Sequence, residues 1–382
     1  MFLNYQLLRI KIEELFIIVF FVMIFSFQFH ALWLLYDILA IFSIFYFIKT
    51  TNKALFSNIL FSLCYFFILL IVSGSYSISF LSIWDNIKHV FVLFVLFSIL
   101  NKHMEYRSLK FVERIGKVLF YTFIIEVIMV FYQYFSGYHF DDISGTFGYG
   151  ASHAIGYFSL LFISYLLYIK QKNSLGFFLI ILTSLVINYM SENMGFYILL
   201  FVLFMFKNIK QFSVFLMITI IVIFFSSSVG IDFVFSMVSR YIAFFNMEDV
   251  SNLEKIASSR GPLMAYAWFL GGFFGAGPGS FSSVYGMVGW KVDTLLNSQI
   301  NISSATNLLS EYGLIGMLLW ILLYLKFLFN FASDYKTKIF MTSFFILVFF
   351  YNRLLMDERI IYMVVLLISF VNISTKIRIK SS

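Results

Sequence analysis

Seven basic residues of this 382-residue chain are of the types that bind phosphate groups, and they stand where cations are unexpected. They are Lys88, Arg240, Lys255, Arg260, Lys291, Arg353 and Arg359. A guanidinium group matches two phosphate oxygens at once, so several of these side chains converging on one point would form an anion site. Anchoring at a membrane interface, or pairing with Asp357, Glu358 or Asp85, is the alternative role for each of them.

The composition of the surrounding chain is that of a membrane protein. Hydrophobic residues make up 62% of it, charged residues 12%, and the mean hydropathy is +0.94, whereas soluble domains are about half apolar and a quarter charged. The net charge of +7 forms no basic patch with interleaved aromatic residues, so nucleic acid is not an expected partner. We expect an all-helical, polytopic protein with residues 1–382 in a single integral membrane domain.

A membrane span needs about 20 apolar residues to cross about 30 Å of hydrocarbon, and this criterion predicts about twelve spans. The first apolar run has no small-residue cleavage site after it and is predicted to be a permanent span. The predicted spans are Glu14–Phe29, Ala31–Ile48, Ala54–Ser73, Asn86–Leu100, Val118–Phe135, Ala154–Ile169, Leu175–Met190, Gly195–Phe206, Phe212–Val229, Ser304–Leu325, Ile339–Tyr351 and Ile360–Asn372.

The distribution of positive charge orients these spans. With both termini in the cytoplasm, the cytoplasmic segments hold 19 of the 26 lysine and arginine residues, as the positive-inside rule requires. The remaining seven are the residues named above, and residues 230–303 form a long outer loop between the ninth and tenth spans. Arg359 has Asp357 and Glu358 beside it, whereas Arg353 has no such neighbours. We therefore expect Arg359→Lys to be better tolerated than Arg353→Lys.

Proline and glycine residues are concentrated in one stretch of the outer loop. Residues 258–286 contain both prolines, Pro262 and Pro278, and seven of the 20 glycines. Ser258 or Ser259 can cap a helix, "LMAYAWFLGGFF" continues it for about three turns, and "GAGPGS" ends it. This amphipathic helix is too short to span and is predicted to lie in the outer interface. Arg260 is at its N-terminal end, where the helix dipole favours anions.

Three stretches of the chain resemble the O-antigen polymerase (Wzy) family, which is related to the O-antigen ligases. In "SSRGPLMAYAWFLGGFFGAGPGSF" an arginine precedes a tryptophan-containing helix and the family's "GxGpG" turn. The segment "SSATNLLSEYGLIG", residues 303–316, is similar to the family's "llxEyGliG" element. Upstream, "YQYFSGYHFDDISGTFGYGASHAIGYF" resembles its "yQ, then sGtf" element between two spans. The order and placement of these elements extend the resemblance over most of the chain.

The resemblance implies a metal-independent glycosyltransferase of the GT-C type in the bacterial inner membrane, with its active site facing the periplasm. Such an enzyme makes lipopolysaccharide glycan by transferring a chain from undecaprenyl pyrophosphate to the non-reducing-end sugar of another lipid-linked repeat unit. No cofactor is implied. The implied partners are these lipid-linked glycans and the bilayer, with a chain-length regulator protein as a further candidate.

The implied reaction needs cations for the departing pyrophosphate and a base for the acceptor hydroxyl. The expected substrate-binding residues are Arg240, Arg260, Arg353, Arg359, Lys88, Glu311 and Asn307. The expected catalytic residues are Arg260, Glu192, His153 and Asp142; Glu311 is a further candidate base, because carboxylates within spans are usually functional or paired. A structural role is the alternative for each base. Asp141 and Asp142 resemble part of a metal motif without a ligand cluster, so no metal is expected.

Two departures from the family pattern bear on function. Ligases place a His-Asn pair just ahead of "llxExG", and no histidine lies between Asp293 and Tyr312, which argues against a ligase. Many relatives carry Ser-Arg at the outer start of the eighth span, where this chain has Glu192. A flippase for lipid-linked oligosaccharides is the alternative from another class, but its halves would be related and its loops short. A ligase or a peptidoglycan-type polymerase is the nearer alternative.

The predicted topology can be tested in the long loop. A cysteine introduced as Ser283→Cys should react with a membrane-impermeant thiol reagent added from outside the cytoplasmic membrane, because only this frame divides the basic residues as observed. Labelling of that cysteine only from the cytoplasm would overturn the topology.

Overall fold

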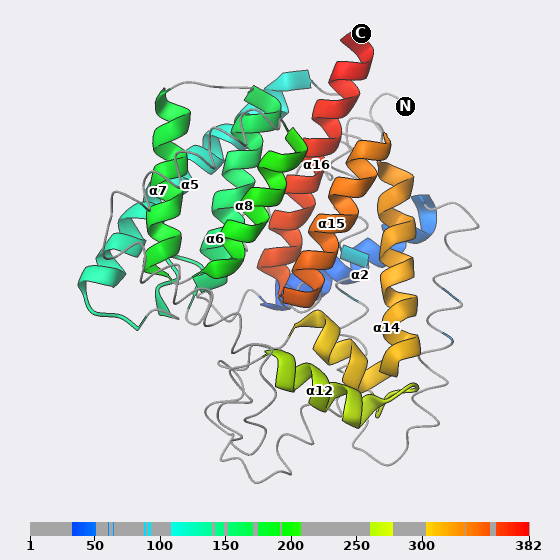
Figure 1. Cartoon of the computed structure of the whole chain (residues 1–382). Helices are drawn as coiled ribbons and strands as arrows, with labels where there is room; N and C mark the ends of the chain where they lie inside the picture. The colour runs from blue at the N-terminus through cyan, green and yellow to red at the C-terminus, as the bar shows by residue number, and fades with distance from the viewer. Residues whose placement is uncertain are drawn as a thin grey trace.

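The computed structural model of the chain is a bundle of helices joined by turns (Figure 1). It describes residues 33–50, 108–139, 142–148, 152–170, 175–191, 193–207, 260–277, 303–332, 334–351 and 357–381, together with residues 60, 64, 88, 91 and 92. These residues are helical apart from the connecting segments, as the composition predicts. Apart from those five single residues, the predicted spans at 14–29, 54–73, 86–100 and 212–229 and most of the outer loop lie outside the described residues, so the number of spans stays a prediction.

Each of the other predicted spans coincides with a helix. The helices are α2 (Trp33–Thr50), α5 (Ser108–Phe135), α6 (Ser152–Ser164) with its π-helical continuation η3 (Tyr165–Lys170), α7 (Leu175–Met190), α8 (Met194–Lys207), α14 (Ser304–Phe331), α15 (Tyr335–Tyr351) and α16 (Glu358–Ser381). Within the described residues, Glu113–Phe135, Ser152–Lys170 and Ser304–Lys326 are long and apolar enough to cross a membrane. The structure is therefore that of a multi-pass membrane protein.

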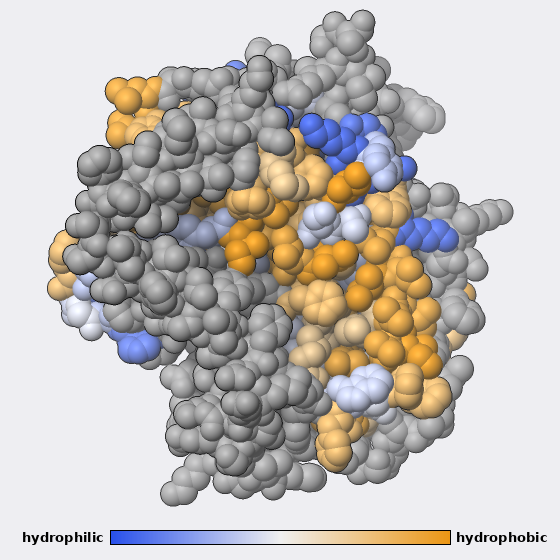
Figure 2. Space-filling view, in the orientation of Figure 1, coloured by the Kyte–Doolittle hydropathy of each residue, from blue (hydrophilic) through white to orange (hydrophobic). Residues whose placement is uncertain are grey.

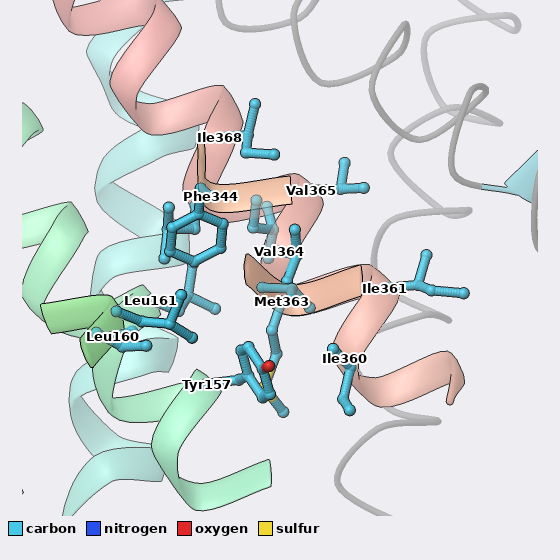
Figure 3. Packing of buried hydrophobic residues seen from close by; sticks show 14 of the residues in the cluster. Tyr157, Leu160, Leu161, Phe344, Ile360, Ile361, Met363, Val364, Val365 and Ile368 are labelled. Carbon is cyan, nitrogen blue, oxygen red and sulfur yellow. The ribbon is translucent and has the colours of Figure 1, made fainter. Parts of the chain in front are cut away.

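Helix α16 forms the centre of the described bundle. All its residues from Ile360 to Ser374 are buried, because α6 packs along one side of it and α15 lies beside it. Figure 3 shows Tyr157 and Leu161 of α6 and Phe344 of α15 directed toward the first turns of α16. Apolar helices in lipid gain little from hydrophobic burial, so close van der Waals packing of this kind holds them together.

Buried polar side chains connect neighbouring helices within this apolar packing. The Asn188 amide of α7 donates to the Ser159 hydroxyl of α6 at 3.2 Å and to the Ser184 carbonyl at 2.8 Å. In η3 the Tyr168 hydroxyl donates to the Leu203 carbonyl of α8 at 3.1 Å. Such interhelical hydrogen bonds are a usual means of fixing the register of membrane helices.

The described surface of the bundle is largely hydrophobic, as expected for helices in a membrane. Figure 2 shows that hydrophobic residues cover most of the described surface of this face, over α14 and down toward α12 (Arg260–Gly271). Helix α12 lies across one end of the bundle, and the C-terminus lies at the opposite end (Figure 1). Helix α12 is thus separated from the C-terminal end of α16 by the length of the bundle.

Helix α14 is broken near its start. Gly313 has φ 68° and ψ −177°, which is not helical, and the chain changes direction there (Figure 1). The residues before the break lie across the end of the bundle beside α12, and the residues after it run along the bundle. The predicted span at Ser304–Leu325 is therefore two helical segments, because the glycine of the "EYG" motif permits a backbone turn.

The turn that follows α12 supplies the hydrogen bonds that the break requires. The amides of Ala276 and Gly277 donate to the carbonyls of Ser310 and Glu311 at 3.0 and 2.9 Å. In return, the amides of Leu314 and Ile315 donate to the carbonyls of Gly272 and Phe273 at 3.0 and 3.2 Å. We call these four bonds the α12–α14 junction. The sequence predicts that this helix continues through Phe274. Helix α12 ends earlier, at Gly271, because the next residue, Gly272, has a φ of 53°.

Glycine at the junction should be indispensable where backbone approaches backbone. At Gly313 an added Cβ would meet the backbone of Phe273 and Gly275, whereas at Gly272 it would meet nothing within 4 Å. Gly313→Ala should lower the free energy of unfolding by about 3 kcal/mol or more, through strain and overpacking. The control Gly272→Ala should cost about 1 kcal/mol, for its positive φ alone. Equilibrium unfolding in mixed detergent micelles measures both, and equal losses would contradict the importance of the junction.

Candidate functional site

The described candidate site lies where α6 and α16 begin. The two helices pack against each other along their length, which brings His153, the second residue of α6, close to the residues around the first turn of α16. Asp357 directly precedes α16 and caps it, because its Oδ1 accepts from the Arg359 amide at 3.0 Å. The loop at 142–148 lies on the same side and completes the cluster.

A chain of hydrogen bonds joins these parts. The Arg359 Nε and Nη2 atoms donate to Oδ1 and Oδ2 of Asp357 at 2.9 and 2.8 Å, so the pair is bidentate. The Arg359 Nη1 atom donates to the Phe147 carbonyl at 2.6 Å. On the other side, the His153 Nε2 atom lies 3.3 Å from Asp357 Oδ2. Asp357 is therefore shared between a guanidinium and an imidazole.

The charges in this cluster differ in exposure. The side chain of Asp357 is 7% exposed, that of Arg359 13% and that of His153 30%. Burial by itself favours the neutral form of Asp357, but the charge of Arg359 and the hydrogen bonds from His153 and Arg359 hold the pKa of Asp357 below its usual range. The carboxylate is thus ionised and its charge is balanced within the protein, which leaves the imidazole as the most accessible group of the three.

The hydrogen bond to Asp357 determines what His153 can do. An ionised carboxylate can only accept, so the ring proton is on Nε2 and the Nδ1 atom of the neutral ring is an acceptor. A histidine oriented by a carboxylate in this way is the usual arrangement of a general base. The backbone of His153 is also held, because its carbonyl accepts a hydrogen bond from the side-chain Nδ2 atom of Asn193 at 3.2 Å.

Two polar side chains of α5 hold the loop that contacts Arg359. The Gln133 Oε1 atom accepts from the amides of Ser144 and Gly145 at 3.1 and 2.8 Å, and its Nε2 atom donates to the Gly145 carbonyl at 3.0 Å. Glu126 accepts from the amide of Thr146 at 2.9 Å and also from its hydroxyl. Gly145 has a φ of 60°, and a Cβ there would meet Glu126. The "yQ" element, which contains Gln133, is therefore hydrogen-bonded to the "sGtf" element at residues 144–147.

The other predicted site residues that the structure describes lie in separate settings. Lys88 Nζ is 3.1 Å from Asp37 Oδ1 and lies over the ring of Tyr36. Glu311 and Asn307 are buried in the first segment of α14, and among the described residues the side-chain amide nitrogen of Asn307 has no hydrogen-bond partner. Asp142 is half-buried at the start of the 142–148 loop, where its amide donates to the His139 carbonyl at 2.8 Å.

The remaining predicted residues are not placed. Arg240, Arg353 and Glu192 lie outside the described residues, and of Arg260 only the backbone is described, as the first residue of α12. Asn193, next to Glu192, contacts His153. Within the described part of the chain, no group of three or more His, Cys, Asp or Glu side chains is arranged to hold a metal ion.

The sequence interpretation missed the residues that orient the cluster. It named Asp357 only as a neighbour of Arg359, and it assigned no role to Glu126 or Gln133. One signal was present, since a glutamate within the predicted span Val118–Phe135 is costly unless it has a partner.

No protein-family model, curated protein or solved structure matches the chain. The family resemblance therefore rests on the three quoted stretches.

The contacts of Arg359 give it a structural role, and its comparison with Arg353 stays a prediction because residue 353 lies outside the described residues. A lysine could not reproduce the bidentate contact with Asp357 together with the bond to Phe147, so Arg359→Lys should lower the free energy of unfolding by about 2 kcal/mol. Asp357→Ala should cost about 3 to 5 kcal/mol, because it removes the carboxylate that compensates the charge of the largely buried Arg359 guanidinium. Thermal and denaturant unfolding of the purified protein in detergent would measure both losses.

A matched control and a pH test accompany this prediction. The pair of Lys170 and Glu113, 2.9 Å apart, is largely exposed, so Glu113→Gln should leave stability almost unchanged. Since the pKa of Asp357 is lowered in the folded protein, its contribution is complete above the unfolded value of about 4 and is lost only at lower pH. The loss in Asp357→Ala should thus be equal at pH 7 and pH 5.5. A loss that vanishes at pH 5.5 would contradict the assignment.

Proposed function

We propose that the chain is a membrane glycosyltransferase that polymerises a surface glycan at the outer face of the bacterial inner membrane. It transfers a glycan from undecaprenyl pyrophosphate to the non-reducing-end sugar of another lipid-linked repeat unit. The observation that carries the proposal is His153, a partly exposed imidazole oriented by the buried pair of Asp357 and Arg359. The resemblance to O-antigen polymerases supplies the substrate class.

In the proposed reaction His153 is the general base. The acceptor hydroxyl attacks the anomeric carbon of the donor, its proton passes to Nδ1 of His153, and the bond from that carbon to pyrophosphate breaks with the electron pair leaving on the phosphate oxygen. Asp357 keeps the ring in the required tautomer and stabilises the imidazolium that forms through its hydrogen bond to Nε2. Arg359 keeps Asp357 ionised, so in this proposal it positions the base and does not bind the pyrophosphate.

The departing pyrophosphate needs other cations. The charges of Arg359 and Lys88 are each balanced by a carboxylate at hydrogen-bonding distance. We therefore assign this role to Arg240, Arg260 and Arg353, the other arginines among the expected substrate-binding residues. Arg260 begins α12, whose N-terminal dipole would add to its attraction for an anion.

The backbone arrangement also supports a site at this end of the bundle. Two pairs of motif elements are joined by hydrogen bonds, "yQ" with "sGtf" in the loop at 142–148 and the "GxGpG" turn with "EYG" at the α12–α14 junction. Irregular backbone in a membrane protein is maintained only where it is buried in protein or lines an aqueous region. Rigid non-helical segments at one end of a bundle suit a site for bulky, polar glycans.

The test of the function is the glycan produced by a strain that lacks the chromosomal gene. With a polymerase missing, gels of surface glycan should show single repeat units on the lipid anchor, and the wild-type chain should restore the ladder. His153→Gln should reduce polymer by a factor of about 10² or more, the usual contribution of a general base. The control is His139→Gln, an exposed histidine that precedes the same loop, which should restore a normal ladder.

Each result separates the alternatives. Complete absence of anchored glycan in the deletion strain would favour a ligase or a flippase. A normal ladder from His153→Gln, at equal membrane abundance, would remove His153 from the reaction while leaving a polymerase possible with another base.

A further inference from the structure

Helix α12 and the turn after it expose a set of aromatic side chains. Phe269 is 87% exposed and Phe274 64%, and Trp268 and Phe273 are also exposed. The rings of Trp268 and Phe273 meet edge to face, with centroids 5.3 Å apart. We call these four residues the aromatic cap. So many exposed aromatic side chains on one short element indicate an apolar partner.

The opposite side of α12 is fixed to the protein. Ala267 and Gly271 are buried, and a Cβ at Gly271 would meet the backbone of Leu309 and Ser310 in α14. The α12–α14 junction adds four backbone hydrogen bonds directly after the helix. Helix α12 therefore cannot rotate to bury the aromatic cap without breaking this packing, and the outward direction of the cap is a fixed property of the fold.

The aromatic cap continues the lipid-facing surface of α14. Ile315, Leu318 and Leu322 are exposed, and their spacing of three and four residues puts them on one face of a segment apolar enough to cross a membrane. The Ile315 amide donates to the Phe273 carbonyl at 3.2 Å, so the cap begins where this stripe ends. Figure 2 shows a largely hydrophobic described surface over α14 and down toward α12.

We propose that the aromatic cap is inserted among the acyl chains of the adjacent membrane leaflet, so that α12 lies in the membrane interface as an anchored helix. Its partner is the lipid surface. Aromatic side chains prefer the boundary between headgroups and hydrocarbon, and an amphipathic helix lying in that plane buries only one face. Because the α12–α14 junction is made of backbone bonds, the depth of α12 in the leaflet also sets the depth of the α14 segment that carries Asn307 and Glu311.

Spin labels on single cysteines can measure this depth. In a Cys64→Ser background, Phe269→Cys and Phe274→Cys would each carry a nitroxide in the full-length protein, reconstituted into phosphatidylcholine vesicles. Leu322→Cys, at a 61% exposed position of α14, is the lipid-facing reference. Ser136→Cys, exposed in the turn after α5, is the water-facing reference. All four positions are exposed, so the labels replace no core packing.

The readout is collision of each label with oxygen, which concentrates in hydrocarbon, and with a water-soluble nickel chelate. We expect the labels at 269 and 274 to resemble that at 322, with oxygen collisions exceeding nickel collisions several-fold. Behaviour like that at 136 would overturn the proposal, because the cap would then face water. Slow motion with little access for either reagent would overturn it as well, since it would mean that another protein segment or a second copy covers the cap.

Discussion

Backbone groups that leave a helix within an apolar bundle must find hydrogen-bond partners inside the protein, and the described structure depends on this constraint. The break at Gly313 frees amides and carbonyls of α14, and the turn after α12 pairs with four of them. The loop at 142–148 meets the same requirement differently, because Gln133 and Glu126 of α5 receive its amides. In both places a glycine with positive φ allows the close approach.

The geometry of the candidate site depends on the hydrogen bonds that hold the loop at 142–148. The loop held by α5 contains Phe147, whose carbonyl accepts a hydrogen bond from Arg359. Arg359 in turn donates to Asp357, and Asp357 contacts His153. Phe147 belongs to the loop at 142–148, Asp357 and Arg359 lie at the start of α16, and His153 belongs to α6. A change in α5 can therefore affect the His153 imidazole on α6 through this series of hydrogen-bonded residues.

The motif segments have a structural role as well as the catalytic one that their family resemblance implies. Gly271 and Gly275 of the long outer loop and Gly313 of α14 are needed because an added Cβ at each would meet the backbone of the other element. The arginine of that stretch begins α12, but its side chain is not described. Pairing between distant motifs also explains why they occur together, because neither half of a pair has its hydrogen bonds without the other.

The sequence by itself determined the all-helical class, the position of each described span and the short helix of the outer loop, because hydropathy and glycine placement act locally along the chain. It also identified His153 and Arg359 as chemically notable. It did not show that Asp357 joins them, that Glu126 holds a loop, or that the helix from Ser304 breaks at Gly313. These depend on contacts between residues far apart in sequence, such as Phe147 and Arg359. Only tertiary packing decides which buried polar group meets which partner.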